Sequence, residues 1–74
     1  MRVIMKTPKE ELGRLLGRKS KIMRLSPRVH ENMAQARRLL LDMEAFRLEF
    51  PEHAGDVMEW EVEIIEGFPG IEEP

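Results

Sequence analysis

The sequence predicts a small α+β domain in which two terminal strands form a sheet beneath one long helix. Residues 27–50 carry apolar side chains at helical spacing, with no glycine or proline after the first position. Residues 57–66 alternate apolar and acidic side chains, a period typical of a strand covered on one face. Residues 1–7 form a second alternating segment, and an isolated strand needs such a partner. We expect one compact domain over residues 1–66 and a flexible tail over residues 67–74.

A short helix is expected over residues 8–17. Thr7 has the hydroxyl of an N-cap, Pro8 suits the first helical position, and Glu10 completes a capping box. Gly17 is expected to end this helix, because glycine is the residue most often found just after a helix. The sequence therefore places a short helix directly after the first strand.

The long helix over residues 27–50 is the central element of the prediction. Ser26 and Pro27 signal its start, and Phe50 before Pro51 signals its end. The preceding residues 20–25 are compatible with a strand and fit a single helical turn from Ser20 nearly as well. The apolar stripe expected to cover the sheet is Val29, Met33, Ala36, Leu39, Leu40, Met43, Phe46 and Phe50.

A second, smaller apolar stripe follows the same long helix. It consists of Ala34, Leu41, Ala45 and Leu48. Because one apolar stripe needs one partner layer, two stripes indicate two partners. We expect the second stripe to meet either the short N-terminal helix or another copy of the chain, and it is the candidate protein interface.

The predicted strand 57–66 has one apolar and one acidic face. The apolar side chains are Met58, Trp60, Val62 and Ile64, and the acidic ones are Glu59, Glu61 and Glu63. The first strand would add Val3 and Met5 to the apolar face, with Arg2 and Lys6 among the glutamates. In the glycine- and proline-rich tail, Phe68 and Ile71 are the groups that could pack against the domain.

Charge is divided unevenly between the two parts of the chain. Residues 1–30 hold nine Lys/Arg and two acidic residues, whereas residues 31–74 hold three Lys/Arg and twelve acidic residues. The two parts can neutralise each other, within one fold or across a dimer, or the basic part can contact nucleic acid. The candidate phosphate-binding side chains are Arg14, Arg18, Lys19, Lys21, Arg24 and Arg28.

Catalytic and metal-binding patterns are absent from the sequence. Ser26 and Thr7 are explained as helix caps, and no spacing brings Ser20 together with a histidine base. His30 and His53 flank the long helix, about 30 Å apart at 1.5 Å per residue, so they cannot share one metal ion. We expect no enzymatic activity, no cofactor, no metal and no small-molecule substrate.

The composition predicts a cytoplasmic protein without a membrane-spanning segment. The chain has no cysteine, which suits a reducing compartment, and its longest apolar run is Leu39 to Leu41. The predicted function is that of a small macromolecule-binding protein of regulatory or adaptor type, with residues 14–28 contacting nucleic acid. The alternative is a protein-interaction or homo-oligomeric module that uses the second stripe and an open sheet edge. The sequence leaves these two partner classes nearly even.

Overall fold

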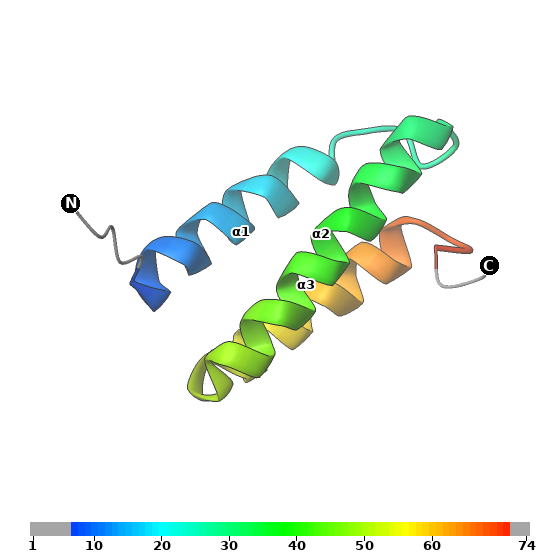
Figure 1. Cartoon of the computed structure of the whole chain (residues 1–74). Coiled ribbons are helices and arrows are strands. Elements are labelled where there is room, and N and C mark those ends of the chain that lie inside the picture. Colours follow the sequence, from blue (N-terminus) through cyan, green and yellow to red (C-terminus); the bar gives the residue numbers. More distant parts are fainter. Residues whose placement is uncertain (1–6, 72–74) are drawn as a thin grey trace.

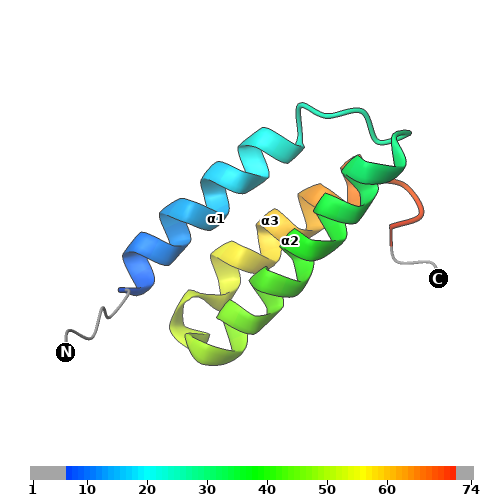
Figure 2. The same cartoon turned by 45° about the horizontal axis from the view of Figure 1, so that its top comes forward.

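Three helices make up the part of the chain that the structure describes, residues 7–71. In this computed structural model, α1 spans Pro8–Ile22, α2 spans His30–Glu49, and α3 spans Ala54–Gly67. A 3-10 turn, η1 (Pro51–His53), joins α2 to α3, which run antiparallel as a hairpin with α1 alongside (Figures 1 and 2). Residues 7–71 contain no strand, so the predicted α+β fold is wrong and the fold is all-helical.

The predicted strand 57–66 is the central part of α3. The same stretch also contains a helical pattern. Val57, Ile64 and Phe68 lie seven and four residues apart, which places them on one face of a helix, and all three are buried. The expected apolar face is split: Ile64 is buried, whereas Met58 and Val62 are exposed. A period of two over ten residues therefore did not identify a strand, since the burial follows the 3.6-residue period instead.

The first helix is longer than predicted. Thr7 is its N-cap as expected, with its hydroxyl accepting from the Glu10 amide at 3.2 Å. The helix continues through Gly17 to Ile22, so residues 20–22 are helical and the following residues form a turn. Gly17 does not end the helix, and no atom lies within 4 Å of the position that a side chain would occupy there. The helix continues because Leu15 and Ile22, seven residues apart, are both buried on one helical face. Residues 1–6, the rest of the predicted first strand, lie outside the described residues.

Helix α2 ends one residue before the predicted end and begins three residues after the predicted start. Phe50, just before Pro51, leaves the α region with φ −126° and ψ 74°. At the other end Ser26 and Pro27 belong to a turn, in which the Val29 amide donates to the Ser26 carbonyl. The Asn32 side-chain amide also donates to that carbonyl, at 3.0 Å. The signal at Ser26 therefore marks a turn that leads into the helix rather than the helix start.

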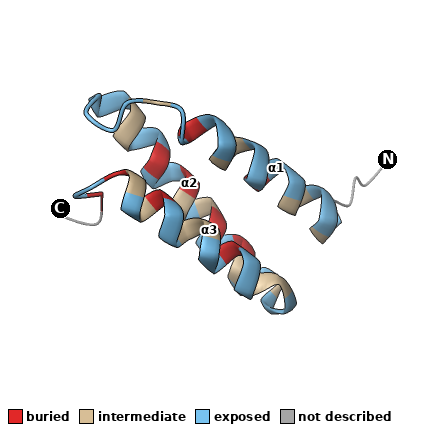
Figure 3. Ribbon diagram, turned by 180° about the vertical axis from the view of Figure 1, so that it is seen from behind, coloured by how far each residue is buried: buried red, intermediate tan, exposed pale blue. Residues whose placement is uncertain are grey.

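The core lies where the three helices face one another, and the outward faces are exposed (Figure 3). It consists of Leu15, Ile22, Ala36, Leu39, Met43, Phe46, Val57, Ile64, Phe68 and Ile71. Seven of the eight residues of the predicted apolar stripe lie in or against the core, but their partners are α1 and α3 instead of a sheet. Val29 is the exception, because it precedes α2 and is 45% exposed.

The segment after α3 folds back onto the core. Phe68 and Ile71, placed by the sequence in the tail 67–74, are both buried. Gly70 has φ 86°, a left-handed conformation that favours glycine and lets the chain turn Ile71 inward. The Arg37 guanidinium donates to the Ile71 carbonyl at 3.1 Å, which ties the segment to α2.

Candidate interaction surfaces

Two of the six candidate phosphate-binding residues connect the basic and acidic parts of the chain. Arg18 pairs with Asp42 of α2 at 2.8 Å, and Lys19 pairs with Glu63 of α3 at 2.8 Å. Both pairs lie on contacts that α1 makes with the other helices. Part of the charge asymmetry is therefore neutralised within the fold, one of the two explanations that the sequence offers.

The other four candidate cations are differently placed. Arg14 lies 3.7 Å from Glu11 within α1. Lys21, Arg24 and Arg28 are exposed and gather at the end of α1 and in the connection to α2, without an ion pair to another residue of the 7–71 range. The structure therefore leaves a smaller basic cluster than the sequence suggested.

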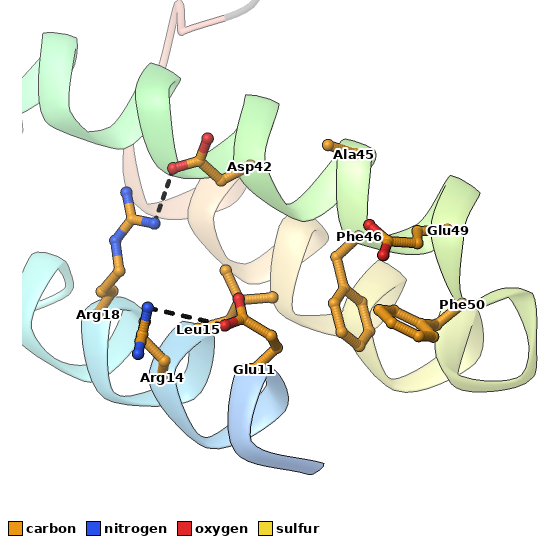
Figure 4. A pocket seen from close by; sticks show the side chains of 9 residues that line it. All are labelled: Glu11, Arg14, Leu15, Arg18, Asp42, Ala45, Phe46, Glu49 and Phe50. Carbon is orange, nitrogen blue, oxygen red and sulfur yellow. Dashed lines mark hydrogen bonds and ion pairs between the residues drawn. The ribbon is translucent and has the colours of Figure 1, made fainter. Parts of the chain in front are cut away.

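A groove between α1 and α2 has charged walls and an aromatic floor. Figure 4 shows Arg18 pointing to Asp42 across the groove and Arg14 pointing to Glu11 beside it. Leu15 and the Phe46 and Phe50 rings, which are tilted by 43° with centroids 5.0 Å apart, complete the lining. Ala45 and Glu49 also border the groove. Because the facing charges already form pairs, this groove offers few unsatisfied groups to a ligand.

The second stripe of α2 is on the outer face of the molecule. Ala34, Leu41, Ala45 and Leu48 are all exposed, with Leu41 at 63% and Leu48 at 74%. At 100° per residue this stripe is centred about 180° from the buried stripe of the same helix. The short N-terminal helix does not cover it, so one of its two predicted partners is excluded.

Helix α3 extends this apolar surface. Met58 and Val62 are 52% and 53% exposed and line, with Leu41, an open groove of about 650 Å³ between α2 and α3. Leu40 and Ile65 are half-buried on its floor. We call Leu41, Leu48, Met58 and Val62 the outer apolar face. The alternating pattern placed Met58 and Val62 on a buried strand face, whereas on α3 they occupy helix positions i and i+4 and are exposed.

Charged residues of both signs surround the groove. Arg47 of α2 pairs with Glu61 of α3 at 2.6 Å, and both side chains are largely covered. Arg37 and Glu44 lie on α2, on the side of the stripe nearer to α3, and also border the groove. An apolar centre with a charged rim is the arrangement found in protein–protein interfaces.

Residues 7–71 contain no cluster of three or more side chains suited to bind a metal ion. His30 is exposed at the start of α2, and the His53 ring lies 6.2 Å from the Phe46 ring at the far end of that helix. The two histidines thus lie at opposite ends of α2. Over the same range no helix combines the length and apolar character needed to cross a membrane.

Comparison of the chain with protein-family models, with curated proteins and with solved structures finds no match.

Proposed function

We propose that this chain is a small, non-enzymatic protein-interaction module that binds its partner through the outer apolar face. The observation that carries the proposal is the exposure of four large apolar side chains on one side of the α2–α3 hairpin. Three of them line one groove, and the fourth, Leu48, lies two turns along α2 from Leu41. The proposed setting is the cytoplasm, which suits a chain without cysteine.

Burying this face against a partner would favour association by the hydrophobic effect. Burying an exposed leucine, methionine or valine contributes about 1.5–3 kcal/mol when burial is complete. These four side chains are each exposed by half or more, so together they offer several kcal/mol before the costs of association are subtracted. Methionine adapts its shape to a partner, which suits Met58 to such a surface.

The rim supports a protein as the partner. Arg37, Glu44, Arg47 and Glu61 surround the groove with both signs of charge, which can orient a partner without favouring a polyanion. Nucleic acid is the second candidate partner. It is supported by the exposed cluster of Lys21, Arg24 and Arg28, whereas Arg18 and Lys19 are already engaged by carboxylates.

Site-specific photocrosslinking tests the proposal. A benzophenone amino acid is placed at position 41 or 62 of the full chain and exposed to an extract of the native cells. The matched control carries it at position 16, because Leu16 is an apolar residue of α1 with 42% exposure that lies outside the proposed face. We expect a discrete protein adduct from positions 41 and 62 and none from position 16. Absence of any protein adduct would refute the proposal.

A salt titration distinguishes the nucleic-acid alternative. Binding to random duplex and single-stranded DNA is measured from low to moderate salt for the wild type and the combined Lys21→Ala, Arg24→Ala and Arg28→Ala variant. Phosphate contacts would appear as an affinity that falls steeply with salt and is lost in the variant. If the partner is a protein, no such salt-dependent binding is expected, and Leu41→Glu, but not the basic variant, should abolish the adduct formed from position 62.

A further inference from the structure

We infer that the occupant of the outer apolar face is a second copy of this chain, packed antiparallel along α2 with a twofold axis at Leu41. This inference rests on the proposed function and names its partner. Its basis is that the exposed stripe of α2 complements itself in shape and in charge when it is reversed about Leu41.

The apolar positions match in size. In a twofold antiparallel pair, a residue k positions before the axis lies level with the residue k positions after it in the other copy. Leu41 then meets Leu41, and Ala34 lies level with Leu48 of the second copy, since both are seven residues from the axis. The fourth residue of the stripe, Ala45, lies level with Arg37 of the second copy, four residues from the axis. A small residue opposite a large one lets two helices approach to the usual 8–10 Å between axes.

The charged positions match in sign. In an antiparallel pair the same flank of each helix faces its counterpart, and Arg37 and Glu44 share the flank of the stripe that lies nearer α3. Arg37 is four residues before the axis and Glu44 three residues after it. Along the helix axis, Arg37 of one copy is therefore offset by only about 1.5 Å from Glu44 of the other. Symmetry repeats this contact, which gives two ion pairs across the interface.

The surroundings leave room for this packing. The stripe is centred opposite the buried stripe of α2, so α1 and α3 lie behind it and do not block a second helix. Met58 and Val62 border the Arg37–Glu44 flank and would be covered by the second copy, which accounts for their exposure in a single chain. On the opposite flank, Glu31 comes near the level of Glu49 of the second copy and Arg38 near the level of its Asp42, so this flank contributes one repulsive and one attractive contact.

The absence of cysteine in the chain allows a direct test of the register. Leu41→Cys is expected to form a disulfide dimer on mild oxidation, whereas Leu16→Cys on α1 is expected not to. Ala34→Cys and Leu48→Cys should each stay uncrosslinked alone, because each site lies about 21 Å along the helix from its own symmetry mate. Mixed together, these two variants should crosslink to each other.

Charge exchange tests the ion pairs independently. Arg37→Glu alone and Glu44→Arg alone each place like charges opposite each other twice, and each should weaken dimerisation by roughly tenfold or more. A mixture of these two variants restores both opposite-charge contacts and should form a one-to-one dimer. Glu49→Lys should tighten the dimer by removing the repulsion on the other flank. Circular dichroism checks that each variant is folded, because Arg37 also donates to the Ile71 carbonyl.

Sedimentation equilibrium of the full chain over a wide concentration range completes the experiment. We expect a reversible monomer–dimer equilibrium that Leu41→Glu abolishes and Leu16→Glu leaves intact. A monomer at every concentration, or crosslinking of Ala34→Cys to itself, overturns the inference. If position 41 captures a different protein while the chain stays monomeric, the proposed function holds and the second-copy inference fails; if position 41 captures nothing and no dimer forms, both fail.

Discussion

Replacing Phe68 with alanine tests whether the segment after α3 belongs to the core. Its side chain is 1% exposed and packs in the same cluster as Ile64 and Ile71. Truncating a buried phenylalanine to alanine costs about 3–5 kcal/mol, from lost burial and from the cavity that is left. At about 0.05–0.15 kcal/mol per residue, a chain of 74 residues has a free energy of unfolding of about 4–11 kcal/mol. Phe68→Ala should therefore remove between a quarter and all of the stability.

Urea unfolding followed by circular dichroism at 222 nm measures this loss. The protein concentration is kept low and equal for all samples, because dimerisation would add to the apparent stability. Leu16→Ala is the matched control, a large apolar residue with 42% exposure, and should cost less than about 1 kcal/mol. If Phe68→Ala loses no more than Leu16→Ala, the packing of residues 67–71 onto the helices is refuted, and the tail is flexible as the sequence analysis expected.

Two further predictions concern α1 and the ion pairs. Gly17→Ala should raise the free energy of unfolding by about 0.5–1 kcal/mol, because Gly17 is inside α1 and an added methyl group meets no atom within 4 Å; a decrease in the urea midpoint would place the end of the helix at Gly17 after all. In double-mutant cycles, the largely covered Arg47–Glu61 pair at 2.6 Å should show a coupling of about 1 kcal/mol or more, and the exposed Arg38–Asp42 pair at 3.8 Å about 0.5 kcal/mol or less. Equal couplings for the two pairs would contradict the burial difference on which this estimate depends.

Several features of the fold followed from local chemistry in the sequence. Thr7 and Pro8 identified the start of α1, because a cap hydroxyl and a proline at the first position act within one turn. Pro51 identified the end of α2 for the same local reason. The main stripe of α2 also identified the residues that form most of its buried face. Leu41 and Leu48, which the sequence separated from the main stripe, are exposed.

Only the tertiary structure decided the state of residues 57–66 and the fate of the charges. Alternation of apolar and acidic residues satisfies a strand locally, but Val57, Ile64 and Phe68 lie together only on a helix, and burying them against α2 and α1 determines the outcome. The pairing of Arg18 with Asp42 and of Lys19 with Glu63 joins residues 24 and 44 positions apart in the chain. Local spacing does not specify such contacts, because they depend on how the helices pack. For the same reason the outer apolar face, which joins Leu41 of α2 to Met58 and Val62 of α3, became visible only when the two helices were placed side by side.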